Sequence, residues 1–295
     1  MNNMRIVSVL SLSILLMASC SKMENESSDA NQNISSETGV GAVTFEAAMP
    51  STKISLGEKD ANGIYKGIWE TGDAVKVVYI ADNSEAGTAT VSAEDADKHI
   101  WSFTIDGVNL GAKARVVYPA SAGYGATLQL SSEQLQQSAG VSSIGQYSYA
   151  VSDVITTSAI NSVAFTLKYI NAVLKINVSS TEYADYSLKS LGFFSKGSAL
   201  AGSFTVSDEG VVSAAEAASD KVVVTLSKPS ALKNEQTVWM TALPADLTGK
   251  KAYVVATLEK DGKELVVPVE FTGKPLEAGK VNVINVELSS AKAVK

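Results

Sequence analysis

The sequence predicts an all-β protein made of antiparallel sandwiches. Short runs rich in Val, Ile, Thr and aromatic residues recur from Val43 onward, several of them alternate apolar and polar residues, and turn residues separate them. Helix signals are scarce, since only SSEQLQQSA (131–139) could form two helical turns behind a serine cap. The expected strands are AVTFEA, AVKVVYIA, HIWSFTI, ARVVYPA, SVAFTLKYI, AVLKINV, KVVVTLS, TVWMTAL, AYVVATLE, KELVVPVEF and KVNVINVEL.

Two of these segments carry finer signals. In LEKDGKELVVPVEF (258–271), Asp261-Gly262 is typical of the two-residue turn of a β-hairpin. Pro268 in the second arm indicates an edge strand, because proline cannot donate to a central ladder. In VNVINVEL (281–288), Ile284 interrupts the apolar alternation, which predicts a β-bulge.

The length of 295 residues suits one large domain or two ordinary ones. We expect two tandem sandwich domains, at 43–160 and 161–295, which meet near the polar stretch TTSAINS (156–162). Two segments support duplication, because ARVVYPASAGY (114–124) and VWMTALPADLTG (238–249) both run from a strand into a Pro-Ala turn.

The N-terminus reads as a secretory signal peptide over residues 1–19. Arg5 precedes a serine-interrupted apolar run, Ile6–Ala18, which is too short to cross a bilayer as a helix. Small residues then precede Cys20, similar to a bacterial lipobox, so cleavage is expected between Ser19 and Cys20, with lipid attached to the Cys20 thiol. An ordinary signal peptide that happens to contain a thiol is the alternative.

Residues 20–42 are expected to be a lipidated, disordered tether, because they have almost no large apolar side chains to offset the entropy of ordering. Glu24 and Glu26 resemble the export signals of lipoproteins that Bacteroidota carry to their outer surface. The expected location is therefore the outer membrane, with the protein anchored by lipid and exposed at the cell surface.

The charge and composition argue against several functions. Asp and Glu total 31 against 24 Lys and Arg, for a net charge of −7, which does not suit nucleic-acid binding. The single Cys permits no internal disulfide, and the single histidine, His99, removes most metal sites and most nucleophile–base pairs. We expect no cofactor, no metal and no nucleic-acid partner.

No catalytic motif emerges either, and we expect a protein that is not an enzyme. The sequence contains neither a G-x-S-x-G nucleophile elbow nor a P-loop. EDAD (94–97) could offer oxygen ligands to calcium, but a solvated loop is the simpler interpretation because the spacing of a dedicated loop is missing. Trp69, Trp101 and Trp239 lie in or beside expected strands, so core packing is their default role.

The segment TKISLGEKDANGIYKGIWETGDAVKVVY (52–79) resembles the opening signature of the fimbrillin-like family of Bacteroidota. The signature residues are Thr52, Lys53, Trp69, Gly72 and Asp73. VVYPA (116–120), FTLKYINAVLKINV (165–178) and LEAGKVNVINVEL (276–288) continue the resemblance in the same order. Physical chemistry gives the signature a structural role, in which Gly72 and Asp73 form a turn and Trp69 covers the core.

The resemblance implies two transthyretin-like β-sandwiches in a surface lipoprotein of type V pili, acting as a pilin, an accessory or tip subunit, or an anchor. In such pilins a protease cuts after a basic residue and removes an N-terminal strand, and a neighbouring subunit inserts a strand in its place. The arginines are Arg5 and Arg115, so processing here would use Lys53 or a later lysine. The short stretch after the last strand favours an anchor, accessory or tip role over the shaft.

The partners implied are the outer membrane through lipid on Cys20, other pilus subunits through strand exchange, and a glycan or protein receptor on a host or bacterial surface. The alternative function is a glycan-binding surface lipoprotein outside any pilus. An exposed row of aromatic residues would favour that alternative, and burial of all three tryptophans would weaken it.

Overall fold

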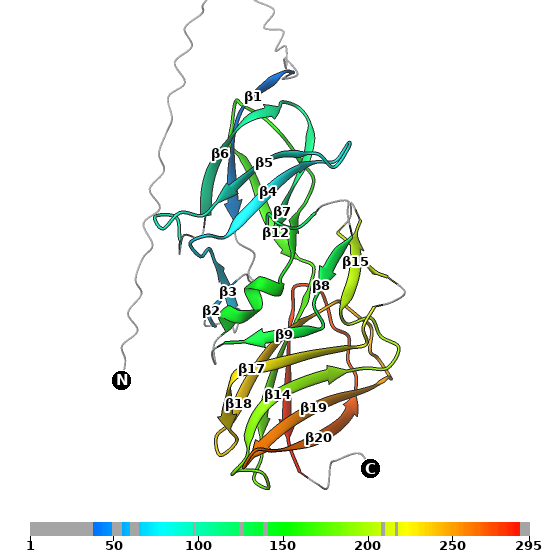
Figure 1. Cartoon of the computed structure of the whole chain (residues 1–295). Coiled ribbons are helices and arrows are strands. Elements are labelled where there is room, and N and C mark those ends of the chain that lie inside the picture. The colour runs from blue at the N-terminus through cyan, green and yellow to red at the C-terminus, as the bar shows by residue number, and fades with distance from the viewer. Residues whose placement is uncertain are drawn as a thin grey trace, which may run out of the picture. The chain divides into compact units, whose positions relative to one another are not determined.

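The structure is a computed structural model, drawn as a ribbon in Figure 1. It describes residues 38–48, 55–59, 65–96, 98, 100–123, 127–137, 141–207, 210–215 and 218–289, with the backbone alone for 55–59, 65–68 and 141–143. These residues belong to one compact unit, Ser36–Lys295. They form β-strands and one short 3₁₀ helix, so the predicted all-β class is confirmed.

The described residues of the first part of the chain, up to Tyr169, form thirteen elements. They are β1 (Val40–Ala48), β2 (Ser55–Lys59), β3 (Tyr65–Ile68), β4 (Ala74–Tyr79), β5 (Glu85–Thr90), β6 (Ile100–Asn109), β7 (Lys113–Tyr118), β8 (Leu128–Leu130), β9 (Glu133–Gln136), the 3₁₀ helix η1 (Val141–Tyr147), β10 (Ala150–Ser152), β11 (Ile155–Thr156) and β12 (Val163–Tyr169).

From Ala172 onward, the residues that the structure describes form nine strands. They are β13 (Ala172–Ser179), β14 (Ser187–Phe194), β15 (Gly202–Val206), β16 (Val212–Ala214), β17 (Lys221–Ala231), β18 (Gln236–Ala242), β19 (Lys251–Lys260), β20 (Lys263–Thr272) and β21 (Val281–Glu287).

Strands from the first part form one sheet in the order β5-β4-β7-β10-β12-β1-β6, with β11 paired to β7. The strands on this path are called the first series. β12 begins after the boundary expected near residue 160, yet it pairs in parallel with β1 and antiparallel with β10. The first series therefore ends at Tyr169, and β13 begins at Ala172.

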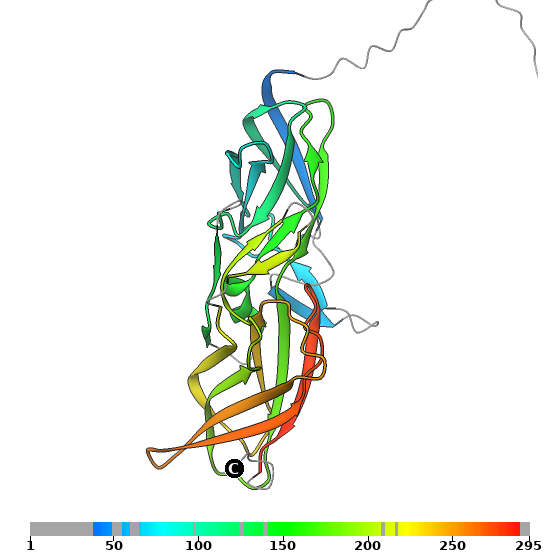
Figure 2. The ribbon, with the colours of Figure 1, turned by 90° about the vertical axis from the view of Figure 1, so that its right-hand side faces the viewer.

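The second part forms two main sheets, β20-β19-β14-β17-β9 and β18-β13-β21. Figure 2 shows β21, in red, alongside β13, in green, with which it pairs in parallel. Read end to end as β17-β14-β19-β20 and β21-β13-β18, these strands repeat the order of the first series position by position, and we call them the second series. Chain order is matched too, because β1 corresponds to β13 and β12 to β21.

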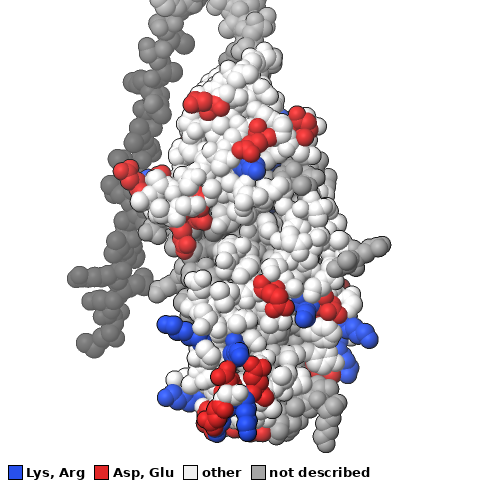
Figure 3. Space-filling view, viewed as in Figure 1, with Lys and Arg blue, Asp and Glu red and all other residues white. Residues whose placement is uncertain are grey.

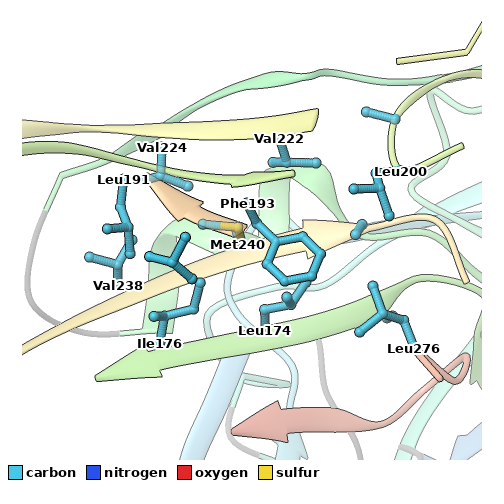
Figure 4. Packing of buried hydrophobic residues seen from close by; sticks show 14 of the residues in the cluster. Leu174, Ile176, Leu191, Phe193, Leu200, Val222, Val224, Val238, Met240 and Leu276 are labelled. Carbon is cyan, nitrogen blue, oxygen red and sulfur yellow. The ribbon is translucent and has the colours of Figure 1, made fainter. Parts of the chain in front are cut away.

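Buried side chains form two main apolar clusters, one within the first series and a larger one around the second series, which also includes Val78, Val117 and Val151 of the first series. The first is built around buried aromatic residues such as Phe45, Trp69 and Trp101. The second contains mainly aliphatic side chains and is seen from close by in Figure 4, where Leu174 of β13 lies beneath the ring of Phe193 of β14. Alternate residues of facing strands supply both clusters, as expected when each sheet buries one face.

The segment that could have formed two helical turns contains a strand instead, β9 (Glu133–Gln136), which pairs in parallel with β17. The alternation explains the difference, because Gln134 and Gln136 are buried while Glu133 and Leu135 are exposed. Tertiary hydrogen bonds to the two buried amides outweigh the weak local preference for a helical turn.

The hairpin signals of the last third are confirmed. β19 and β20 are joined by Asp261-Gly262, and both turn residues have a positive φ, of 50° and 70°. Pro268 lies in β20, which is an edge strand as predicted. The bulge expected at Ile284 is wrong, because β21 keeps an unbroken register with β13. Ile284 packs against the second cluster and Val281 against Trp239 on the opposite face, so both faces of β21 carry apolar contacts.

Candidate functional site

β1 lies in the interior of its sheet, although it is the first strand of the described chain. It pairs in parallel with β12, from Phe45↔Val163 to Ala48↔Thr166, and antiparallel with β6 along most of its length. Val43, Phe45 and Ala47 point into the first cluster and are fully buried. Loss of β1 would therefore leave an apolar slot between β12 and β6, each with an unpaired edge.

Aromatic rings line the slot that β1 occupies. Phe45 stacks on Phe103 with 5.4 Å between ring centroids, and Phe103 lies 4.5 Å from Trp101 and 6.2 Å from Phe165. These rings come from β1, β6 and β12, so β1 covers a cluster that spans both neighbouring strands. Such contacts add to the burial of apolar area, which contributes about 1.5–3 kcal/mol for a large side chain.

The signature residues Trp69, Gly72 and Asp73 form one turn just before β4. Gly72 has a φ of 93°, a conformation that residues with a Cβ rarely adopt. The Asp73 carboxylate accepts the backbone N–H of Glu70 through Oδ2 at 2.8 Å and the hydroxyl of Tyr118 through Oδ1 at 2.9 Å. Trp69 is fully buried and meets the ring of Trp101 edge-on, at 5.0 Å.

This turn creates a buried polar spot in the first cluster. Burial, and next the charge of Asp73, raise the pKa of Tyr118 far above its usual range. Burial likewise raises the pKa of Tyr169. The hydroxyl of Tyr169 and the indole N–H of Trp69 are buried without a hydrogen-bond partner among the described residues. Asp73 thus anchors the start of β4 to β7, a structural role.

Several predicted residues lie outside the described residues. These are Ser19 and Cys20 at the expected cleavage and lipidation site, Thr52 and Lys53 of the signature, and His99. Lys53 occurs in the sequence between the end of β1 at Ala48 and the start of β2 at Ser55. Its expected role in processing stays a prediction.

Among the described residues, no group of three or more His, Cys, Asp or Glu could hold a metal ion. In the EDAD segment, Asp95 accepts hydrogen bonds from Ser92 and Lys98, and the bond from Lys98 is the main cause that lowers the pKa of Asp95. No helix within the described ranges is long and apolar enough to cross a membrane.

All three tryptophans are buried, as their positions in or beside strands predicted. Trp69 and Trp101 lie in the first cluster. Trp239 packs with Ile144 and Val173 on the outer side of β13 and β18, where the ammonium of Lys175 lies 5.4 Å from its ring centroid. This burial weakens the glycan-binding alternative, because none of the tryptophans presents an open face to a sugar ring.

Two buried glutamines, which sequence reasoning missed, close one edge of the β18-β13-β21 sheet. Gln134 donates to the carbonyl of Thr241 at 2.9 Å and accepts its backbone N–H at 3.1 Å. Gln136 accepts the backbone N–H of Trp239 at 2.9 Å and donates to the carbonyl of Thr237 at 3.2 Å. The only local signal is their alternation with Glu133 and Leu135.

Charged side chains of both signs lie close together in one region of the surface. Figure 3 shows Lys and Arg beside Asp and Glu over the region of β14, β19 and β20. There Lys189 forms ion pairs with Glu259 and Glu264, and Lys251 pairs with Glu270. Such interspersed charge leaves no continuous basic surface over these described strands (Figure 3).

The chain matches no family model and no curated protein sequence. Three solved structures of candidate cell adhesion proteins are similar to it. The protein from Bacteroides uniformis has a TM-score of 0.55 at 12% identity, covering 86% of this chain and 96% of its own. Those from Bacteroides ovatus and Bacteroides fragilis have TM-scores of 0.56 and 0.51 at 15% and 13% identity, covering 84% and 83% of this chain and 92% of each of theirs.

These matches extend over nearly the whole length of the compared proteins, so the likeness includes both series of strands. At identities of 12–15% the likeness shows a shared fold. The chain has the fold of these Bacteroides candidate cell adhesion proteins.

Proposed function

We propose that the protein is a fimbrillin-like surface lipoprotein that serves as a structural or adhesive subunit of type V pili. It acts as an anchor, accessory or tip subunit rather than in the shaft. Each series of strands forms one β-sandwich of a tandem pair, and lipid on Cys20 holds the protein at the outer membrane. The resemblance of the sequence and the shared fold with candidate adhesion proteins support this function.

The observation that carries the assembly mechanism is the position of β1. This strand is flanked on both sides and buries Val43, Phe45 and Ala47, so its removal opens a slot with two free edges and an aromatic floor. A strand from another subunit could replace it, with main-chain hydrogen bonds for affinity and alternate apolar side chains for fit. Lys53 follows β1 in the sequence and is the proposed cleavage point.

Limited digestion with a lysine-specific protease tests strand exchange. Cleavage after Lys53 is expected to free the segment with β1 and to yield SDS-resistant multimers. Lys53→Gln should prevent both, whereas Lys228→Gln, at an exposed position on β17, should leave both unchanged. A protein that is trimmed after Lys53 yet stays monomeric contradicts exchange through this slot.

The lipid anchor has an independent test. Cys20→Ala is expected to move the protein from the membrane fraction to the soluble fraction without changing its thermal unfolding, because one acylated residue carries the attachment. Cys20→Ser is the conservative companion and should behave alike. Retention of either variant in the membrane fraction would contradict anchoring through Cys20.

A further inference from the structure

The two series of strands differ at one equivalent junction. In the first series, β10 pairs antiparallel with β12 through Ala150↔Tyr169, Val151↔Lys168 and Ser152↔Leu167. The corresponding strands of the second series, β20 and β21, do not pair, and the sheet order breaks between them. Within the described ranges, β20 is paired only to β19, and β21 only to β13.

A groove of about 510 Å³ lies at this break. Its lining is mainly apolar and comes from both strands and from the floor of the second cluster. The apolar residues include Phe193, Val269, Phe271, Leu276, Ile284 and Val286. Lys274 is the charged residue of the lining, and none of the ion pairs formed among the described residues includes it.

The edge of β21 is competent to pair with another strand. In a parallel ladder, successive residues turn their backbone groups alternately toward and away from the neighbouring strand. Lys280 accepts from the N–H of Val173, so the backbone groups of Val281, Val283 and Asn285 point away from β13. None of the hydrogen bonds within the described part of the chain uses these groups, and Val283 is 52% exposed.

β20, on the other side of the groove, is less suited to pairing. Pro268 has no N–H to donate. Because β20 pairs with β19, the nitrogen of Pro268 must point away from β19, toward the outer edge. The outer edge of β20 therefore lacks one donor. β21 contains no proline and no lysine, the residues that natural edge strands commonly use to block pairing.

We propose that the groove between β20 and β21 binds an extended segment of a partner protein, which adds antiparallel to β21. The segment carries apolar side chains at alternate positions, which fill the groove over Phe193 and Phe271, and a carboxylate that reaches Lys274. The antiparallel direction follows the β10–β12 pair of the first series. This edge is distinct from the β1 slot of the proposed function, so either site can fail without the other.

A peptide as long as β21, which has 7 residues, supplies the probe. It alternates valine and threonine, ends in glutamate and is amidated, and a second version ends in lysine. Binding to the full chain is expected to saturate and to slow amide hydrogen exchange at Val281, Val283 and Asn285. The glutamate peptide should bind about twofold to fivefold more tightly than the lysine peptide, and Lys274→Glu should reverse this order.

Val283→Pro removes one edge donor while leaving the bonds to β13 intact, and should weaken the peptide about tenfold, as loss of one main-chain hydrogen bond can. Val283→Thr keeps the N–H and should bind normally, as should Val266→Pro, at an exposed valine of β20 outside the lining. Thermal unfolding of each variant shows whether it has folded.

Three outcomes overturn the proposal. The first is absence of saturable binding by either peptide to the full chain. The second is binding only after residues 290–295 are deleted, which would assign the groove to the chain's own end. The third is a dimer in the free protein that Val283→Pro dissociates, which would assign it to a second copy.

Discussion

The two edges of the β18-β13-β21 sheet have similar backbones, but within the described residues one edge is hydrogen-bonded by side chains and the other is not. Val173, Lys175 and Asn177 of β13 pair with Thr241, Trp239 and Thr237 on one side, and with Val281, Val283 and Asn285 on the other. On the β18 side, Gln134 and Gln136 satisfy the outward backbone groups. On the β21 side the described chain supplies no such partner, and a groove remains.

The closed edge depends on a segment from elsewhere in the chain. β8 and β9 follow β7 of the first series, yet β8 pairs with β15 and β9 with β17. This connection thus completes the second series, and its side-chain amides substitute for a missing strand. The difference shows that the backbone groups of a sheet edge are satisfied where the fold places polar side chains beside every second residue of the edge strand.

The largest expected effect on the free energy of unfolding concerns β1, the strand of the first series that fills the slot between β12 and β6. Phe45→Ala removes a fully buried ring stacked on Phe103 and should lower the free energy of unfolding by about 3–5 kcal/mol, measured by denaturant titration. Leu174→Ala, in the corresponding strand β13, should cost about 2–5 kcal/mol. Val40→Ala, at an exposed position of β1, is the control, and an equal loss there would contradict the role given to the buried face.

The next largest effect concerns an ionisable hydrogen bond of the first series, between Tyr118 and Asp73, whereas the glutamines at the edge of β18 do not ionise. The Tyr118–Asp73 hydrogen bond should contribute about 1.5–3 kcal/mol, which Tyr118→Phe removes. Burial and Asp73 raise the pKa of Tyr118 above its ordinary 10.0, so the folded protein keeps a proton that the unfolded chain releases. Stability should be full below about pH 10 and fall above it, by about 1.4 kcal/mol per pH unit for each such tyrosine.

Tyr118→Phe should make that alkaline decline shallower, which equilibrium unfolding at several pH values measures. Tyr169 should continue to contribute, because burial raises its pKa as well. A decline with the same slope in Tyr118→Phe and in the parent chain would show that Tyr118 is not the titrating group.

At the sealed edge, Gln134→Ala or Gln136→Ala should each cost about 1–3 kcal/mol of unfolding free energy, because buried backbone groups of β18 would lose their partners. Hydrogen exchange at Trp239 and Thr241 should accelerate. Gln137→Ala is a matched control on the exposed residue that follows β9. Unchanged exchange in the variants would mean that water seals this edge equally well.

The smallest effect is expected at the open edge of the free protein. Val283→Thr should change the free energy of unfolding by less than about 0.5 kcal/mol, as should Val266→Thr on β20, because both valines are more than half exposed. Denaturant titration of the pair checks this. A large loss confined to Val283→Thr would indicate that this edge is already occupied.

Local chemistry made several elements predictable. Alternating Val, Ile and aromatic residues indicated the strands, and Asp261-Gly262 indicated a hairpin because glycine and aspartate adopt positive φ at low cost. Pro268 indicated an edge strand, and burial of the tryptophans followed from their place in or beside strands. The helical turns considered for 131–139 and the bulge expected at Ile284 were wrong, since partners distant in sequence decide both.

The sequence by itself determined that this chain forms β-structure and contains one cysteine and one histidine, because strand pattern and composition are local properties. Only the tertiary structure decided which strands pair, that β12 belongs with β1, and that β9 seals one edge while β21 leaves another open. The reason is that strand pairing joins residues far apart in the chain, and the same apolar alternation fits many neighbours until the whole sheet is assembled.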